Sequence, residues 1–162
     1  MAVDYFLKIN GIPGESQDSQ HKNEIQLDNW SFGATQMGTA EHGSGMGAGR
    51  VSAQDFHFIK RIDISTPKLV QYCSSGQEID SAVLTARRAG ATPVQFLQIT
   101  FKNVIISSYN TLGTASSDIV PRDEISFNFV NVQMVYTIQG PSGQAIGNVP
   151  MQYDLKQQYQ GA

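Results

Sequence analysis

Hydrophobic and polar residues alternate along most of this chain, which is the period-two pattern of half-buried β-strands. The alternation recurs in VDYFLKI, EIQLDNWSFGATQ, VSAQDFHFIKRI, IDSAVLTARRAG, TPVQFLQITFKNVIISSY, DEISFNFVNVQMVYTIQ and VPMQYDLKQQY. In DEISFNFVNVQMVYTIQ the apolar parity changes between Phe129 and Val130, as expected of one long strand that serves two packing surfaces. The pattern predicts a mainly β domain with a two-sheet, β-barrel-like or sandwich architecture.

The same alternation predicts which side chains face the core. Trp30 and Phe32 share one face of their segment, whereas Ile25 and Leu27 have the opposite parity. Either a bulge near residues 28–29 or burial of both faces would reconcile the two pairs. The predicted core residues are Trp30, Phe32, Phe56, Phe58, Leu69 and Cys73.

One short helix is predicted in STPKLVQYCSSG. Thr66 can cap its first turn, and Pro67 fits the first helical position, where a missing N–H costs nothing. Leu69 and Cys73 lie one turn apart on the buried side, and Gly76 can end the helix in the left-handed conformation. Because so short a helix is not stable alone, we expect it to dock on a sheet or plug a barrel mouth.

The stretch QMGTAEHGSGMGAGRV interrupts the alternation with a glycine-rich run. Hairpin connections usually close in two to five residues, so a connection over residues 38–49 needs a function or a partner that orders it. NTLGTASSD, residues 110–118, is a second predicted flexible zone. A phosphate-binding loop is the weaker interpretation, because strand-like VSAQDFHF follows where a helix N-terminus would be required.

Charged residues make up 15% of the 162 residues, against roughly 25% in an average soluble domain. Neutral polar groups must therefore cover much of the surface, and they are cheaper to desolvate than charges when proteins meet. The net charge of −3 and the lack of a basic run argue against a nucleic-acid partner. MAVDYFLKIN has no features of a secretory signal, and no segment is long and apolar enough to span a bilayer. We expect a soluble cytosolic protein whose export, if any, needs no signal peptide.

The sequence offers no constellation for catalysis, metal binding or cofactor binding. His21, His42 and His57 are well separated, with no cysteine partner and no two-histidine helical spacing. Cys73 is the single cysteine, and its predicted inward position favours a small buried hydrophobe over a reactive thiol. Gly-x-Ser-x-Gly does not occur, and the carboxylates are scattered. We therefore predict no enzyme and no cofactor.

Several segments, in this order, resemble the Hcp family, the haemolysin-coregulated proteins of bacterial type VI secretion systems. They are FLKINGIPGES, EIQLDNWSFG, the glycine-rich run, VSAQDFHFIKRIDISTPKLVQYCSSG, and AVLTARRAG with FLQITFKNVIISS. The resemblance spans about residues 2–138. Its most specific parts are Gly14-Glu15-Ser16, Trp30, residues 63–69 with Pro67, and Cys73-Ser74-Ser75-Gly76.

The resemblance implies one tube-subunit domain over residues 1–162, with a β-barrel-like fold of two sheets and a flanking helix. Family members form hexameric rings that stack into a hollow tube inside a contractile sheath and beneath a spike trimer. Contraction expels the tube from the bacterial cytoplasm, and rings can carry small effector proteins. The implied partners are further copies of the chain, sheath, spike and baseplate proteins, and small effectors, without membrane insertion.

In this family the long loop projects from the barrel and contacts an adjacent subunit or ring. The resemblance therefore implies that residues 36–50 form an assembly arm. Glycine permits unusual backbone shapes but makes a free arm costly to order, so a neighbouring subunit would have to stabilise its final shape. The predicted arm residues are Met37, Gly38, Gly43, Gly45, Met46, Gly47, Gly49 and Arg50.

Three neutral residues are predicted to face the tube lumen. Ser31 lies on the polar parity opposite Trp30, and Ser126 and Asn128 lie opposite Phe127. If this face lines a channel, short neutral side chains would form a wettable wall that binds diverse cargo weakly and releases it.

Two other classes of protein compete with the tube subunit. The first is a soluble β-sandwich binding module, for carbohydrate or another small ligand, with Trp30 or residues 109–118 as its platform. The second is a β-barrel hydrolase that uses scattered carboxylates, for which no constellation stands out. Fold alone cannot decide between these classes.

Overall fold

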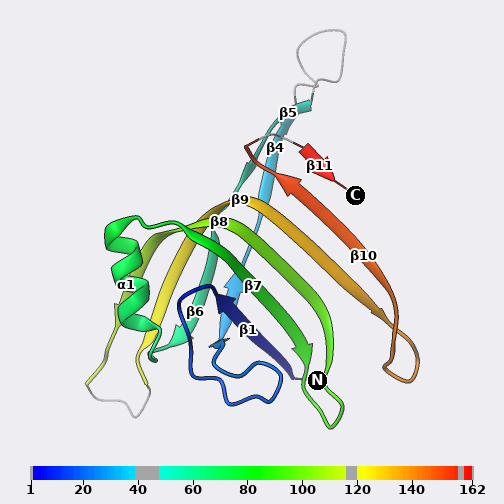
Figure 1. The fold of residues 1–162 in the computed structure, drawn as a ribbon, viewed down its shortest axis with the longest axis horizontal. Helices are drawn as coiled ribbons and strands as arrows, with labels where there is room; N and C mark the ends of the chain where they lie inside the picture. The colour runs from blue at the N-terminus through cyan, green and yellow to red at the C-terminus, as the bar shows by residue number, and fades with distance from the viewer. Residues whose placement is uncertain (1, 39–47, 116–119, 157–158, 162) are drawn as a thin grey trace.

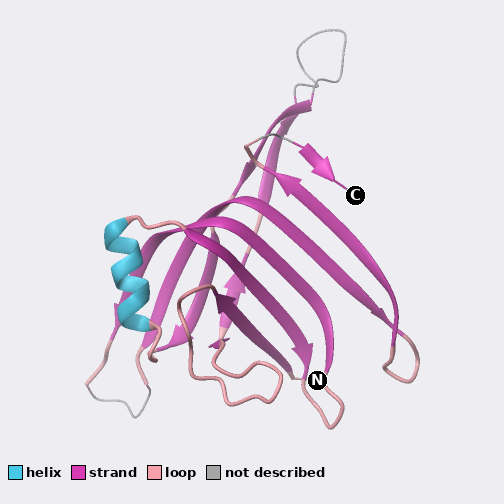
Figure 2. Cartoon of the chain, in the orientation of Figure 1, coloured by secondary structure: helices cyan, strands magenta, loops and turns pink. Residues whose placement is uncertain are grey.

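The computed structural model describes residues 2–38, 48–115, 120–156 and 159–161. Nearly all of its regular structure is β, with one helix, α1 (Thr66–Ser75), at one end of a strongly curved sheet (Figures 1 and 2). The strands are β1 (Val3–Ile9), β2 (Ile25–Leu27), β3 (Asn29–Ser31), β4 (Ala34–Gly38), β5 (Ala48–Ala53), β6 (Phe56–Arg61), β7 (Ile79–Arg88), β8 (Val94–Leu112), β9 (Arg122–Gln139), β10 (Ala145–Asp154) and β11 (Tyr159–Gly161).

The strands form two sheets. The larger has nine strands in the order β11-β10-β9-β8-β7-β1-β2, with β6 paired to β9 and β3 paired to β6. The smaller is the two-stranded ribbon β4-β5. The predicted mainly β, sandwich-like fold with one flanking helix is confirmed, although the described strands do not close into a complete barrel.

A break at Asp28 lets one segment reach both sides of the curled sheet. β2 pairs with β1, and β3 pairs with β6, while the N–H of Asp28 donates to the carbonyl of Ile59 at 2.8 Å. This break explains the change of parity seen in the sequence, because Leu27 before it is buried and Trp30 after it also packs on the core. Residues 25–31 therefore connect β1 on one side of the core with β6 on the other.

The centre of the core is a group of phenylalanine rings. Phe56 lies 4.9 Å from Phe101 and 5.0 Å from Phe127, measured between ring centroids. Such rings bury large apolar areas and add favourable edge or offset contacts. Among the predicted core residues, Phe56, Phe58 and Leu69 are fully buried; Trp30, Phe32 and Cys73 are partly buried and pack against this core.

Strand β9 changes its buried parity where it changes its neighbour. Ile125, Phe127 and Phe129 are buried in the first half, and Val132 is buried in the second. The first half pairs with β6, whereas the second pairs with β10, and β8 runs beside both. The predicted role of this strand in two packing surfaces is confirmed.

Helix α1 packs against β8 and ends as predicted at Gly76, whose φ of 65° is left-handed and whose N–H donates to the carbonyl of Tyr72. The predicted cap is wrong. Ser65 occupies the N-cap position without a side-chain capping bond, and Thr66 lies inside the first turn. The Thr66 hydroxyl instead donates to the carboxylate of Asp123 and accepts from the N–H of Asp63 and from Lys60.

Candidate functional site

The ribbon β4-β5 projects away from the curved sheet (Figure 1). Its register pairs Gln36 with Val51 and Gly38 with Ala48, with an irregularity between Gln36 and Gly38. The predicted loop over residues 38–49 is therefore too long, because antiparallel pairing continues into it from both sides. Likewise, β8 runs to Leu112, into the second predicted flexible zone.

Four of the predicted arm residues belong to the ribbon, and the other four lie outside the described residues. Met37 and Gly38 end β4, and Gly49 and Arg50 belong to β5. Gly43, Gly45, Met46 and Gly47 lie outside the described residues. The described ends of the glycine-rich run therefore belong to a paired ribbon that projects from the body of the sheet.

Two of the three predicted lumen residues lie in one row across the sheet. Ser31 pairs with His57, His57 pairs with Ser126, and Ser126 pairs with Ser108. Paired residues share a face of the sheet, so β3, β6, β9 and β8 each contribute one small or polar side chain. Asn128 lies two residues beyond Ser126 and shares that face.

A bulge enriches this row with hydroxyl groups. The register between β8 and β9 shifts between Ile106 and Ser108, so Ser107 and Ser108 both reach the Ser126 hydroxyl. Ser107 also donates to the carboxylate of Asp55 at 2.5 Å. The sequence shows two adjacent serines, but only the register reveals that they meet residues from another strand.

The row contains serines and a histidine, the residue types that serve as nucleophile and base in serine hydrolases. Among the described residues, no hydrogen bond joins His57 to Ser126 or Ser31. The row presents hydroxyl groups and one imidazole on a single face of the sheet.

A buried polar network lies at the α1 end of the sheet. The fully buried Lys60 donates to Asp123 at 2.9 Å, to Asp63 at 3.0 Å and to Thr66 at 3.0 Å. Burial works to raise the pKa of Asp123, but the hydrogen bonds from Thr66 and Lys60 and the Lys60 charge hold that pKa below its ordinary value. The network ties α1 to β6 and β9.

A second charged group fixes the loop between β1 and β2. Arg87 forms a bidentate pair with Asp18, with one contact of 2.9 Å, and its guanidinium lies 4.9 Å from the Phe6 ring centroid. His21 stacks on Phe6 at 4.5 Å. Hydrogen bonds from Arg87 and from the backbone N–H of Gln20 keep the pKa of Asp18 well below its ordinary value. The loop is clamped over Phe6.

The same loop explains one motif of the sequence. The N–H of Gly14 donates to the carbonyl of Asn23 at 2.8 Å. A Cβ at Gly14 would lie 2.5 Å from the backbone oxygen of Glu24 and 2.7 Å from Cα of Ile25, so only glycine fits. The glycine of the Gly-Glu-Ser motif is thus a packing requirement of the loop.

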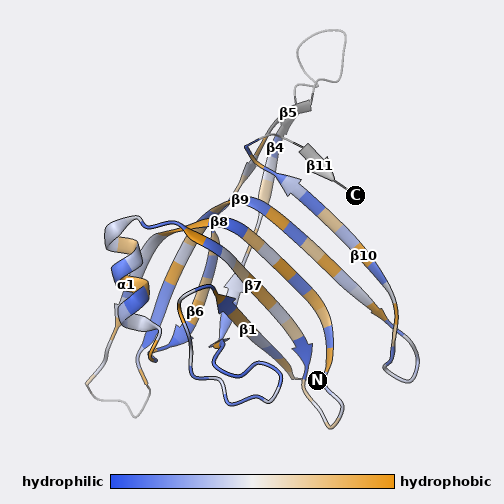
Figure 3. Ribbon diagram, viewed as in Figure 1, coloured by the Kyte–Doolittle hydropathy of each residue, from blue (hydrophilic) through white to orange (hydrophobic). Residues whose placement is uncertain are grey.

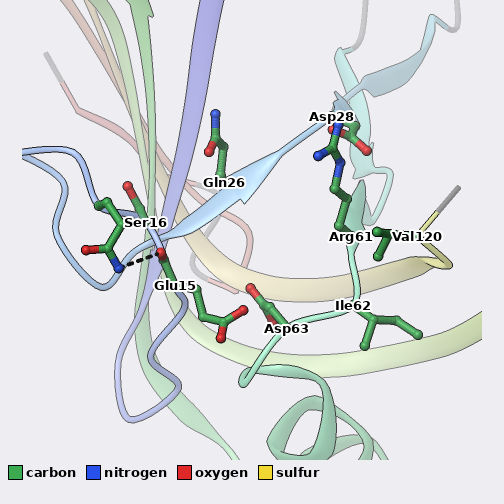
Figure 4. A pocket seen from close by; sticks show the side chains of 9 residues that line it. Glu15, Ser16, Gln26, Asp28, Arg61, Ile62, Asp63 and Val120 are labelled. Carbon is green, nitrogen blue, oxygen red and sulfur yellow. Dashed lines mark hydrogen bonds between the residues drawn. The ribbon is translucent and has the colours of Figure 1, made fainter. Parts of the chain in front are cut away.

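A hollow of about 490 Å³ opens beside this loop (Figure 4). Arg61 extends toward Asp28 at one end, and Glu15 and Asp63 lie at the other. Two of these carboxylates are already paired with cations, Asp63 with Lys60 and Asp28 with Arg122. Within the described ranges, no three His, Cys, Asp or Glu side chains gather closely enough to hold a metal ion. The described helix is too short to cross a membrane.

Two aromatic residues of the binding-module interpretation, Trp30 and Tyr109, make contacts within the protein. Trp30 stacks on Phe56 at 6.0 Å and meets the edge of Tyr5 at 5.9 Å. Tyr109 donates its hydroxyl to Asp123 at 3.0 Å, and burial, then this bond, raises its pKa. Trp30 therefore already makes two ring contacts within the protein, and the hydroxyl of Tyr109 is already bonded.

The structure thus defines a mainly β protein with one curled sheet, one flanking helix and a projecting two-stranded ribbon. The family model described as "Type VI secretion system effector, Hcp" matches residues 6–136, and the chain belongs to this Hcp family. Over 154 residues it is 42% identical to Protein hcp1 of Pseudomonas aeruginosa, covering 94% of each chain.

Solved structures agree over the whole chain. The crystal structure of Hcp1 from Salmonella typhimurium has a TM-score of 0.81 at 32% identity, with 99% of each chain covered. A structure described as a type six secretion system protein has a TM-score of 0.93 at 26% identity, covering 99% of this chain and 100% of the other. A type VI secretion system effector from Yersinia pestis has a TM-score of 0.76 at 34% identity, covering 93% and 99%.

Proposed function

We propose that this chain is the structural subunit of the inner tube of a type VI secretion system. Six copies form a ring, the rings stack into a hollow tube, and sheath contraction expels it. The observation that supports this role best is the row from Ser31 through His57 to Ser126 and Ser108, because it places polar side chains from four strands side by side on the sheet face opposite the core. That face suits the wall of a water-filled channel.

The proposed tube makes several kinds of contact. Copies of the chain contact one another within and between rings, and the tube contacts sheath, spike and baseplate proteins. The subunit waits in the bacterial cytoplasm and leaves through the secretion system without a signal peptide. No step in this cycle asks the chain to break or form a covalent bond, so its role is structural rather than catalytic.

Small effector proteins would bind inside the ring along the serine row. The hydroxyls of Ser31, Ser107 and Ser126 can donate or accept hydrogen bonds, so the wall accommodates cargo surfaces of different chemistry. Neutral contacts of this kind are individually weak in water. Weak contacts suit a carrier that must release its cargo.

The native mass of the purified protein tests the assembly. Light scattering after size exclusion should give about six times the chain mass of 17.7 kDa, and the same peak should show annular particles by negative stain. A monomer at every concentration and salt tested would refute the tube proposal.

A substitution in the row tests the cargo surface. Ser31→Gln places a longer side chain beside His57, so co-purification and export of at least one small effector should fall by about tenfold, the effect of about 1.4 kcal/mol. Ser19→Gln, on the exposed loop between β1 and β2, is the matched control. If rings of both variants carry and export every effector alike, Ser31 does not face cargo.

A further inference from the structure

The core-facing side of the large sheet continues into solvent. One cross-strand row on this side consists of Leu27, Tyr5, Ala86, Leu97, Tyr136 and Val149. From Ala86 onward burial falls along the row: Ala86 is fully buried, Leu97 is partly buried, Tyr136 is 46% exposed, and Val149 is 54% exposed. The face that builds the core at β1 and β7 is therefore uncovered at β9 and β10.

The neighbouring rows show that the uncovered residues belong to the core side. Met134 pairs with Met151 and packs against the core, and Tyr136 and Ile138 follow Met134 on the same face of β9. Ile138 is 40% exposed. We call Tyr136, Ile138 and Val149 the hairpin face. Figure 3 shows hydrophobic positions continuing along β9 and β10 as they leave the body of the sheet.

The hairpin lacks the usual protection of an exposed sheet edge. No charged residue occurs between Glu124 and Asp154, although the chain averages 15% charged residues. Among the described residues, β11 pairs with residues 152–154 of β10, so the rest of this edge has no strand beside it; Pro150 limits backbone pairing there, but it leaves the apolar side chains uncovered. Edge strands normally carry charges that discourage association, whereas the centres of protein interfaces are poor in charge. These features favour a protein partner.

A second apolar patch lies at the opposite end of the molecule. Ile62, Leu112 and Val120 are all exposed, Leu112 by 75%. They are neighbours, because Val120 lines one hollow with Ile62 and another with Leu112. We call these three residues the end patch. In Figure 1 this end lies near α1, on the left, and β10 lies on the right.

We propose that the hairpin face of one copy packs on the end patch of a second copy. The inference rests on the proposed tube function and identifies surfaces that hold its copies together. The two patches differ and lie at opposite ends, so the contact is head-to-tail, the type that closes into a ring when the rotation between copies allows it. The second copy would cover the part of the apolar face that the chain leaves open.

Two charge substitutions and their mixture test the pairing. Val149→Asp and Leu112→Asp each place a carboxylate in one patch, and each should reduce the sixfold particle to a monomer. Mixed in equal amounts, the two variants should form a species of twice the chain mass, because each still has the patch that the other lacks. Ile105→Asp, which changes an exposed apolar residue outside both patches, should remain sixfold.

The outcomes separate this inference from the proposed function. If the wild type forms rings and Val149→Asp or Leu112→Asp forms them equally well, the pairing is wrong and the tube proposal stands. A Leu112→Asp variant that remains dimeric, with no new species on mixing, would show that hairpin faces pair with each other. A monomeric wild type would overturn both proposals. Far-UV circular dichroism should match the wild type in every variant, since all three sites are exposed.

Discussion

At the scale of single residues, Lys60 shows how a charge can be part of a core. It has the parity of Phe56 and Phe58 on β6, and Asp123 has the parity of Ile125 on β9. Both charged groups are fully buried. Because a buried charge is costly unless it is paired, a charged residue at a core parity on each of two strands is a signal from which this pair could have been predicted.

Asp123→Asn should lower the free energy of unfolding by about 3 kcal/mol at neutral pH, because it leaves the Lys60 ammonium buried with one carboxylate fewer. Urea unfolding at a fixed protein concentration measures the change. Glu124→Gln, at the exposed neighbouring position, should stay within about 0.5 kcal/mol of the wild type. Equal effects of the two substitutions would show that the network contributes nothing.

The same pair has a predictable dependence on acid. Because the pKa of Asp123 is below its ordinary 3.8 in the folded chain, its stabilising contribution is complete above pH 3.8 and is lost as the pH falls through the folded value. Repeating the urea titrations between about pH 5 and pH 2 should show a smaller acid-dependent loss in Asp123→Asn than in the wild type. Parallel curves would contradict this assignment.

At the scale of elements, alternation predicted strands well and connections poorly. It located β1, β7, β8 and β9 because each has a long apolar face. It did not predict that β4 and β5 pair so far into the glycine-rich run, since small residues give no alternation to read. The break at Asp28 was predicted only as one of two alternatives, because a change of partner strand is a property of the assembled sheet.

The end of α1 gives a test at this scale. Gly76→Ala should cost about 1 kcal/mol, because alanine is strained at φ 65° even though its Cβ would meet nothing within 4 Å. Thermal unfolding measures the cost. Gly113→Ala is the control, as its Cβ would make only an ordinary 3.9 Å contact with Pro121 and its φ is not left-handed. Equal melting temperatures would show that Gly76 is not the helix stop.

At the scale of the whole molecule, sequence parity assigned Ser31 and Ser126 to the side opposite the core, but it could not bring them together. Their meeting with His57 depends on the register of β3, β6 and β9, which are far apart in sequence. The hairpin face and the end patch could not be predicted from the sequence either, because the exposure of an apolar face depends on which strands end early. The position of the serine row and the exposure of these patches both depend on pairing between strands that are far apart in sequence.

The ribbon offers a direct test of the assembly arm. Gly38 and Ala48 are paired, so replacing residues 39–47 with Asn-Gly would close the ribbon with a two-residue turn. We expect a folded subunit with an unchanged circular dichroism spectrum but fewer or shorter tubes by negative stain, because the arm would no longer reach a neighbour. A control with the loop replaced by nine residues of Gly and Ser separates reach from side-chain contacts. Normal tubes from the Asn-Gly variant would show that the arm is dispensable.

The lack of charge between Glu124 and Asp154 has a consequence for the conditions under which copies stay together. Dissolved ions screen interactions between charged groups, and the hairpin face has no charged side chain whose interactions could be screened. Apolar contacts instead respond to the cohesion of water: they strengthen in ammonium sulfate and weaken on cooling. Rings held by this face should therefore tolerate both dilute buffer and concentrated sodium chloride, and a cold sample should be the first to come apart.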